Sequence, residues 1–192
     1  GGYIYSDGRH LCSLCQTSVV KEDSVIQNSY RSVLNQLESV GIQNIPRDLS
    51  IELVNLHQLN NNSRNLAHEK LKGFTRMELL KISNKNQTRT YQMFLLNGLP
   101  KIEFEAVLAH ELLHIWLYEQ NAVLSLEKTE GFCNLGSSLI YENDSTQFSR
   151  IHLQALESEP DPIYGGGFRS MKSRLDKLGW NKLLKNIAGI NK

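Results

Sequence analysis

The sequence contains a His-Glu-x-x-His motif within the stretch AHELLHIW, residues 109–116. If this stretch is helical, His110 and His114 project from one face about one turn apart, close enough to bind one metal ion. Glu111 is rotated away from that pair, so its carboxylate could reach a water molecule held by the metal. A chance match to the motif in a chain of this composition has a probability of roughly one in a hundred. The alternative is a buried helix whose histidines find ordinary hydrogen-bond partners.

The neighbours of the two histidines favour the metal. Residues on their stripe and on the opposite side of the helix are almost all apolar: Ala106, Val107, Leu108, Leu112, Leu113, Ile115, Trp116 and Leu117. Two imidazoles in such surroundings cost roughly several kcal/mol unless each finds a partner. No other polar residue falls on their stripe after Glu103.

A third ligand would have to come from another segment, because a catalytic zinc site uses three protein ligands and leaves one position for water. The predicted helix LEKTEGFCNLGSSLIY, residues 126–141, offers Glu127, Glu130 and Cys133. Free cysteine is more often a small core residue than a ligand. Glu130 lies on a stripe that is otherwise apolar or small: Leu126, Cys133, Ser137 and Ile140 or Tyr141.

Glu127 lies on a different side of the same predicted helix. It shares that side with Gly131, Asn134 and Ser138, a combination that suggests contact with solvent. Gly131, beside Glu130, would let the two predicted helices approach closely, because glycine has no side chain. Glu130 is therefore favoured as the third ligand.

The elements that must position these residues follow from turn and periodicity signals. Residues 1–15 predict a hairpin on the Asp7-Gly8 turn, and a helix is expected from Asp23 or Ser24 to about Val40, ended by Gly41. Strands are predicted at 51–54, 77–82 and 90–96, with turns at 84–87 and 97–100. Helices are predicted at about 102–119, 126–142, 146–157 and 168–189, the last interrupted at Gly179, with a loop at 159–167. Strands followed by helices indicate an α+β fold with a small mixed sheet before a helical C-terminal half.

Composition bounds the class of protein and its partners. The 192 residues are 40% hydrophobic and 21% charged, with a formal net charge of +1, so we expect no nucleic-acid partner and no membrane surface as partner. Apolar runs fall far short of the roughly 20 residues that cross a bilayer. No signal peptide is visible, although the chain opens with Gly-Gly rather than Met. The compartment is left open, with the cytoplasm slightly favoured.

A second candidate metal site lies near the N-terminus. Cys12 and Cys15, with His10 as a weaker candidate, supply half of a four-ligand zinc site. Either a further Cys-x-x-Cys precedes this segment, or the pair is a disulfide or a remnant without metal; we favour the first. The expected domains are a partial zinc knuckle at 1–20 and a second domain at 21–192.

Three segments together resemble a known family: AHELLHIWL, TEGFCN and ESEPDPIYGGGFRS, residues 157–170. They are similar to the ubiquitin-activated, LIM-containing "DA-one" peptidases that limit organ growth in plants, and to their bacterial relatives. DGRHLCSLC resembles the last zinc knuckle before the peptidase domain of that family. The resemblance implies a zincin-like metallopeptidase of the gluzincin type that requires Zn²⁺, with His110, His114 and Glu130 as ligands and Glu111 as catalytic base.

The chain also departs from that family. Where the family tends to have two adjacent acids before the glycine, this chain has Thr129-Glu130, which leaves only Glu130 at the matching place. A LIM module needs more ligands than Cys12 and Cys15, and no intact ubiquitin-binding motif is recognisable. Regulation by ubiquitin or another activating protein is therefore not carried over to this chain.

The expected reaction is zinc-assisted hydrolysis of internal peptide bonds in a polypeptide substrate. Tyr164, in the glycine-flanked segment DPIYGGGFR, could swing over the zinc and hold the oxyanion, with Arg169 as second choice; the alternative is that Tyr164 only packs. The strand at 90–96 is expected to be an edge strand that pairs with an extended substrate. Two other functions are considered: a non-catalytic zinc-containing interaction module, which would have no use for Glu111, and a zinc hydrolase acting on a non-peptide bond.

Overall fold

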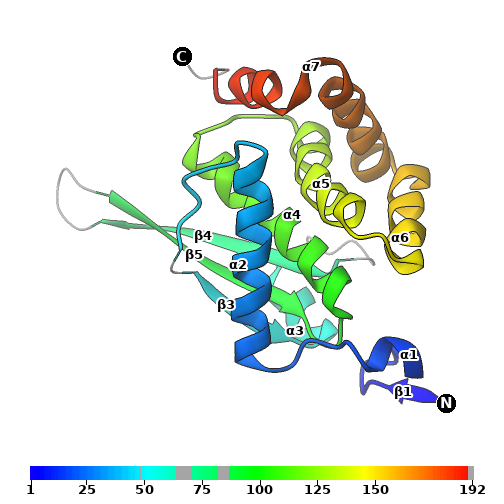
Figure 1. Ribbon diagram of the computed structural model, residues 1–192. Helices are drawn as coiled ribbons and strands as arrows, with labels where there is room; N and C mark the ends of the chain where they lie inside the picture. The colour runs from blue at the N-terminus through cyan, green and yellow to red at the C-terminus, as the bar shows by residue number, and fades with distance from the viewer. Residues whose placement is uncertain (48, 64–70, 82–86, 190–192) are drawn as a thin grey trace. The chain divides into compact units, whose positions relative to one another are not determined.

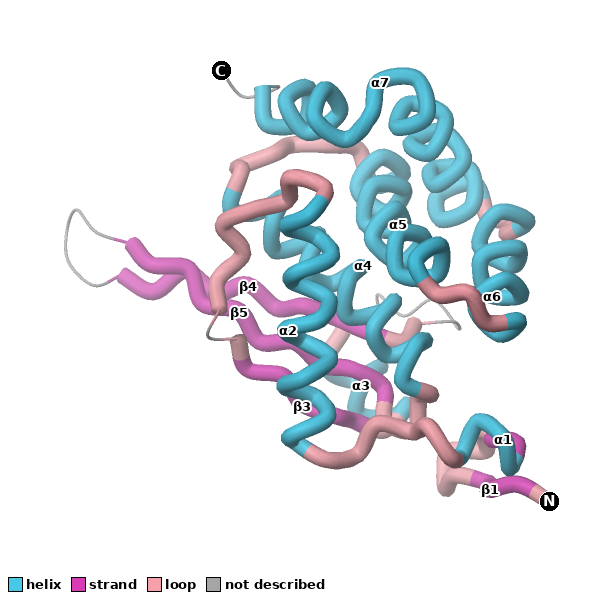
Figure 2. Tube along the Cα trace, in the orientation of Figure 1, coloured by secondary structure: helices cyan, strands magenta, loops and turns pink. Residues whose placement is uncertain are grey.

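The computed structural model describes residues 1–47, 49–63, 71–81 and 87–189. The chain divides into two compact units, Gly1–Glu22 with Pro46–Lys101 and Asp23–Ile45 with Ile102–Lys192. The strands of the described residues belong to the first unit, and the described elements of the second are helical (Figure 2). This confirms the predicted α+β class.

The N-terminal hairpin forms as predicted. Strand β1 (Gly2–Ile4) pairs antiparallel with β2 (His10–Cys12), and Gly8 takes a φ of 86° in the turn between them. Such a positive φ suits glycine because it has no Cβ. The guanidinium of Arg9 donates to the carboxylate of Asp7 and to the backbone carbonyl of Asn97, which ties the hairpin to the turn after the last strand. A short helix that the sequence did not predict, α1 (Ser13–Gln16), follows at once.

The larger sheet of the first unit is mixed, as predicted. Its strands are β3 (Ser50–Val54), β4 (Gly73–Lys81) and β5 (Gln87–Leu96), in the order β3-β5-β4. β5 runs parallel to β3 and antiparallel to β4 (Figure 1). A capped helix that was not predicted, α3 (Leu56–Asn62), follows β3. Residues 82–86, which include the predicted strand end at Ile82 and most of the predicted turn at 84–87, lie outside the described part of the chain. Gln87, the last residue of that predicted turn, is instead the first residue of β5.

The prediction that residues 90–96 form an edge strand is wrong. β5 is the central strand, because β3 pairs with it on one side and β4 on the other. Its backbone groups are therefore engaged on both sides and leave no edge for an extended peptide. The sequence carries the reason: Tyr91 and 93–96 are all buried, a nearly continuous apolar run of the kind found in a central strand.

The second unit begins with α2 (Asp23–Ser39), whose buried residues recur at helical spacing: Ile26, Ser29, Tyr30, Val33, Leu34 and Leu37. The helix ends at Ser39, close to the predicted end at about Val40, and Gly41 stops it as predicted, with a φ of 96°. The backbone N–H of Ile42 donates to the carbonyl of Leu37, and that of Gly41 to Glu38. These two bonds form a Schellman cap.

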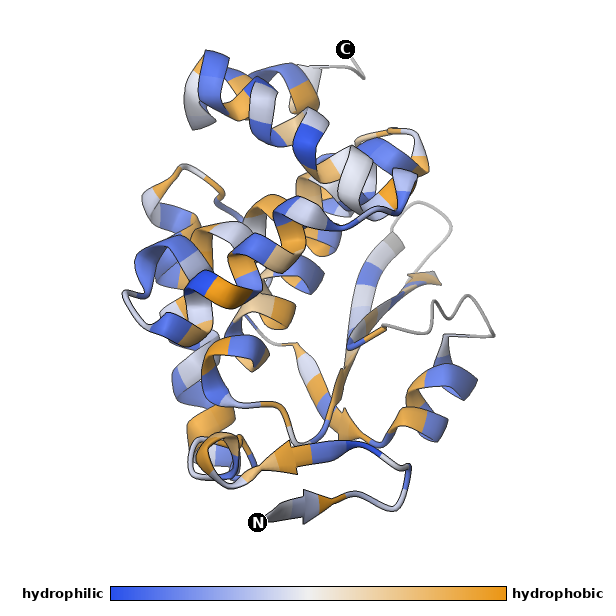
Figure 3. Ribbon diagram, turned by 90° about the vertical axis from the view of Figure 1, so that its right-hand side faces the viewer, coloured by the Kyte–Doolittle hydropathy of each residue, from blue (hydrophilic) through white to orange (hydrophobic). Residues whose placement is uncertain are grey.

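Four longer elements complete the second unit: α4 (Lys101–Glu119), α5 (Leu126–Asn143), α6 (Gln147–Ser158) and α7 (Gly167–Gly189). α7 is broken at Gly179, which has a φ of 70°, as the sequence predicted. In Figure 3 the helical segments near the C-terminus alternate between hydrophilic and hydrophobic residues along their turns. α5 packs against α2, α6 and α7. No helix among the described residues is long and apolar enough to cross a membrane.

The predicted loop at 159–167 is partly wrong, because it contains a turn of π-helix, η1 (Pro162–Gly166), that runs directly into α7. The carboxylate of Asp161 accepts hydrogen bonds from the backbone N–H groups of Ile163 and Tyr164, and so caps this turn. The glycines allow close packing: a Cβ at Gly165 would overlap the carbonyl oxygen of Glu159. The turn is thus a hydrogen-bonded and closely packed element rather than an irregular loop.

Candidate metal centre

Helix α4 is buried nearly all round, as its sequence predicts, with one exception. From Glu103 to Leu117 every residue is buried except Val107, His110 and His114, which lie on one stripe and are partly exposed. The two imidazole side chains retain 17% and 19% of their accessible surface. The only accessible face of this part of α4 is therefore the face that carries the histidines.

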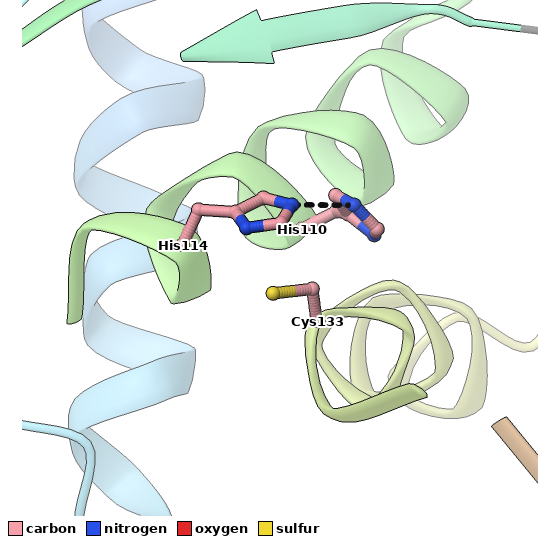
Figure 4. A group of neighbouring side chains, drawn as sticks. All are labelled: His110, His114 and Cys133. Carbon is pink, nitrogen blue, oxygen red and sulfur yellow. Dashed lines mark hydrogen bonds between the residues drawn. The ribbon is translucent and has the colours of Figure 1, made fainter. Parts of the chain in front are cut away.

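The two imidazoles meet on that face. The Nε2 atoms of His110 and His114 are 3.2 Å apart, and the rings are arranged edge to face with centroids 4.9 Å apart. Figure 4 shows both rings on α4 and the dashed contact between them. The spacing of four residues thus brings both nitrogens to one point, as predicted.

Glu130 brings a carboxylate to the same point from α5. Its Oε2 lies 3.3 Å from Nε2 of His110, and its Oε1 lies 3.7 Å from Nε2 of His114. With metal–ligand distances of about 2.0–2.2 Å and tetrahedral angles, zinc ligand atoms lie about 3.4 Å apart. The three separations around this cluster, 3.2, 3.3 and 3.7 Å, are close to that value. The residues present therefore fit a zinc ion.

Asn134 fixes which nitrogen of His110 faces the cluster. The Asn134 amide nitrogen donates to the backbone carbonyl of Tyr164 at 3.4 Å, which turns its Oδ1 toward Nδ1 of His110 at 2.9 Å. An amide oxygen only accepts, so Nδ1 of His110 carries the hydrogen. Nε2 of a neutral His110 then presents a lone pair to the Glu130 carboxylate, an arrangement that requires either a proton or a metal ion between them.

The charges of the cluster are strongly coupled. Burial lowers the pKa of His110, but the hydrogen bond to Glu130 and the charges of Glu111 and Glu130 outweigh burial, so that the pKa is raised above its usual 6.5. Burial and the neighbouring His110 lower the pKa of His114 to about 4. Burial raises the pKa of Glu130, but its hydrogen bond to His110 and both histidine charges leave it lowered overall. The carboxylate of Glu130 is therefore ionised at neutral pH and available as a ligand.

Cys133 also lies close enough to the two histidines to compete with Glu130 as the third metal ligand. Its Sγ and a ring nitrogen of each histidine all lie within 4.8 Å of one another, and Figure 4 shows the thiol extending from α5 toward the rings. The residue is fully buried, and burial, with the negative charges of Glu130 and Glu111, raises the pKa of the thiol well above its usual 9.0. Because metals bind thiolate, a metal ion would have to displace the proton of Cys133, whereas the carboxylate of Glu130 is already ionised.

Glu111 and two tyrosines surround the cluster. Glu111 is buried, and its charge contributes to the raised pKa values of His110, Cys133 and Tyr164. For Tyr164, burial is the largest cause, followed by the charges of Glu130, Asp161 and Glu111, so the phenol stays protonated at neutral pH. Tyr118, one turn beyond His114, was missed by the sequence reasoning; burial and the charges of Cys133, Glu111 and Glu130 raise its pKa as well.

The sequence predicted that the side of α5 carrying Glu127 faces solvent. That prediction holds for Glu127 but is wrong for the other residues on this side. Glu127 is exposed, but Gly131, Asn134 and Ser138 are buried. A Cβ at Gly131 would overlap the carbonyl of Gly167. Gly131 therefore allows α5 to pack closely against the start of α7, not against α4 as predicted. The glycine that faces α4 is Gly136, opposite the carbonyl of Ala109. Sequence reasoning missed Asn134, although its position one turn after Glu130 was a usable signal.

The remaining predicted residues lie elsewhere. The Arg169 guanidinium donates to the backbone carbonyls of Glu157 and Glu159 at the end of α6, and is thus engaged away from the oxyanion role considered for it. In the first unit, Cys12 and Cys15 are not joined by a disulfide, and the Cys15 backbone N–H donates to Sγ of Cys12. His10 is an exposed residue of β2.

The fold and the cluster define an α+β protein with a candidate metal centre between two helices. A family model described as "DA1-like: Protein DA1" matches residues 31–154, well over half of the chain and the part that holds both histidines and Glu130. The chain therefore belongs to the DA1-like family. This confirms the family resemblance noted in the sequence.

Curated relatives agree with this assignment. The chain is 24% identical to "Protein DA1" of Arabidopsis thaliana over 95% of its own length and 44% of that protein. It is 22% identical to "Protein DA1-related 2" of the same plant over 96% of its length and 47% of that protein. The chain thus spans less than half the length of these relatives. No solved structure matches it.

Proposed function

We propose that this chain is a zinc-dependent endopeptidase of the gluzincin type, in which His110, His114 and Glu130 hold the metal. The observation that carries the proposal is the Glu130 carboxylate, which reaches both Nε2 atoms of a His-Glu-x-x-His helix from a second helix. Two histidines and one glutamate form the ligand set of catalytic zinc sites, whereas structural sites are usually closed by four protein ligands. The order of a mixed sheet, the motif helix and a glutamate-bearing helix is consistent with a zincin-like fold.

Zinc bound here would polarise the scissile carbonyl and lower the pKa of a bound water toward about 7. Glu111 is adjacent to His110 on α4 and contributes its charge to the same cluster without lying between the two imidazoles. In the proposed reaction its carboxylate accepts a proton from the attacking water and passes it to the leaving amine. Glu111 is thus assigned as general base and acid.

Tyr164 is proposed as the donor that stabilises the developing oxyanion. Its phenol is protonated at neutral pH and lies within electrostatic reach of Glu130 and Glu111. The capped turn η1 holds its backbone, so the donor would need little reorganisation when charge develops. This assignment differs from a swinging tyrosine, because Gly165, the residue after Tyr164, packs closely against the carbonyl of Glu159.

The N-terminal hairpin is proposed as half of a zinc knuckle. The Cys15 backbone N–H donates a hydrogen bond to Sγ of Cys12. This hydrogen bond lowers the pKa of the Cys12 thiol and so favours the thiolate, the form that binds metal. Cys12 and Cys15 supply two of four ligands, so we expect a second zinc only where further ligands complete the site. Adding ubiquitin to the peptidase assay described next tests whether it activates the chain.

The proposal is tested by digestion of an unbiased peptide library. The zinc-loaded chain should cleave internal peptide bonds, a chelator should abolish cleavage, and added zinc should restore it. A chain that binds zinc but cleaves no peptide, with or without ubiquitin added, would favour the interaction module or a hydrolase of another bond. A chain purified without chelators that holds no zinc and takes none up would overturn the proposal.

A further inference from the structure

A single buried side chain, Asn134, touches both parts of the proposed active site. Its Oδ1 accepts a hydrogen bond from Nδ1 of His110 at 2.9 Å, and its Nδ2 donates to the backbone carbonyl of Tyr164 at 3.4 Å. The side chain thus joins a ring on α4 to the turn η1 that carries the tyrosine. We propose that Asn134 is a positioning residue that sets the tautomer of His110 and ties η1 to the metal centre; this inference rests on the proposed metal site.

The two hydrogen bonds fix the amide in one orientation. If the amide were turned over, its oxygen would face the Tyr164 carbonyl, and two acceptors would oppose each other. Its NH₂ group would also face Nδ1 of His110, which would then have to be the bare nitrogen. The observed orientation is the one in which both contacts pair a donor with an acceptor.

The consequence for His110 is direct. With hydrogen on Nδ1, the Nε2 lone pair points at the place where Glu130 and His114 converge. Histidine ligands of metals commonly donate their other ring N–H to an oxygen, which fixes ring orientation and raises basicity. In this chain the described partner of Nδ1 is an amide on the same helix as Glu130, one turn further on.

The consequence for η1 is separable from the consequence for the metal. Asp161 caps the first turn of η1 through its N–H groups, whereas Asn134 holds the carbonyl of Tyr164. Loss of the Asn134 NH₂ donor should free the backbone carbonyl of Tyr164 from this hydrogen bond, while the hydrogen bond to Nδ1 of His110 should remain. Asn134→Asp makes this separation, because it keeps an acceptor for Nδ1 and removes the donor.

The first test needs neither zinc nor mutation. Long-range ¹H–¹⁵N spectra of the metal-free chain, at a pH where His110 is neutral, should show its hydrogen on Nδ1. Hydrogen on Nε2 would overturn the inference, while the proposed peptidase would stand or fall by its own assay. This readout remains decisive even if every variant at position 134 fails to fold.

The second test compares variants of the full chain by competition with a zinc chelator and by the visible spectrum of the Co²⁺ form. Asn134→Leu, which keeps the volume but not the polar groups, should weaken zinc roughly 10–100-fold and change the Co²⁺ spectrum. Asn134→Asp should keep parental zinc affinity but lower kcat, with KM little changed. The matched control is Ser137→Ala, which removes another buried bond from α5 to α4, the 2.8 Å bond to the Ala106 carbonyl.

These outcomes separate positioning from packing. Equal zinc loss in Asn134→Asp and Asn134→Leu, or equal loss in Ser137→Ala, would mean that position 134 acts only through general packing. Parental zinc affinity and an unchanged Co²⁺ spectrum in Asn134→Leu would overturn the inference. A parent that takes up no metal would instead overturn the proposed function, and the tautomer measurement would still decide the orientation of His110.

Discussion

The Glu130 carboxylate lies 3.3 Å from Nε2 of His110, although the two residues stand on different helices and are separated by nineteen intervening residues. Because this carboxylate lies next to both imidazoles, we expect that zinc binding depends on it. Glu130→Gln should weaken zinc binding by several orders of magnitude, because it replaces a charged oxygen ligand by a neutral amide. Zinc affinity is measured by chelator competition.

The control for this change lies on the same helix. Glu127 is exposed and is one turn earlier on α5, so Glu127→Gln changes net charge and helix propensity alike but removes no group from the cluster. Its zinc affinity should equal that of the parent. Loss of zinc in Glu127→Gln with retention in Glu130→Gln would contradict the ligand assignment.

Cys133 provides a second contrast, since its thiol also faces the histidines. Cys133→Ala should keep zinc affinity within a few-fold of the parent, because the buried thiol is protonated in the metal-free chain and the proposed third ligand is Glu130. It should cost some stability through the small cavity that it leaves. If Cys133→Ala loses zinc while Glu130→Gln retains it, sulfur and not oxygen completes the site.

Zinc affinity should depend on pH in two steps. The pKa of His110 in the metal-free chain is raised above 6.5, so zinc must displace a proton from it already at near-neutral pH. Affinity should therefore fall about tenfold per pH unit below that pKa. The pKa of His114 is about 4, so a steeper fall should begin only near that pH. A fall of a hundredfold per unit already at pH 6–7 would show that both rings are protonated there.

The close packing of η1 predicts opposite effects for two adjacent glycines. A Cβ at Gly165 would overlap the carbonyl oxygen of Glu159, whereas the nearest atom to a Cβ at Gly166 is the carbonyl oxygen of Asp161 at 3.9 Å. Gly165→Ala should destabilise by about 1–3 kcal/mol, as overpacking does. Gly166→Ala should leave the melting temperature unchanged or slightly higher. Thermal unfolding of both variants decides, and equal melting temperatures would contradict the packing of this turn.

The motif helix and the helix bounds could be predicted because they depend on local signals. Spacing of four residues places His110 and His114 together in any helix, and Gly41 and Gly179 end or break helices through their own backbone preference. The choice of Glu130 over Glu127 also followed from spacing, and the geometry places Glu130 at the histidines.

Other features depend on tertiary partners and were missed for that reason. Whether β5 is central or at an edge depends on which strands pair with it, although its nearly continuous apolar run was a sign. The side of α5 with Asn134 and Ser138 looked polar, but α4 and η1 supply hydrogen-bond partners for the buried Asn134, and Glu142 of α5 itself accepts from the Ser138 hydroxyl. The glycines at 165–167 suggested a mobile loop, whereas neighbouring carbonyls occupy the space that a side chain would need at Gly165 and at Gly167.

The central claim, that this metal centre hydrolyses peptide bonds, is tested most directly by Glu111→Gln. Zinc content by elemental analysis and peptide cleavage are measured on the same preparations of parent and variant. Glu111 is not among the proposed ligands, so the variant should hold as much zinc as the parent, while cleavage falls roughly 10²–10⁴-fold through loss of the general base. A Glu111→Gln chain that retains zinc and cleaves peptides at the parental rate would contradict the account.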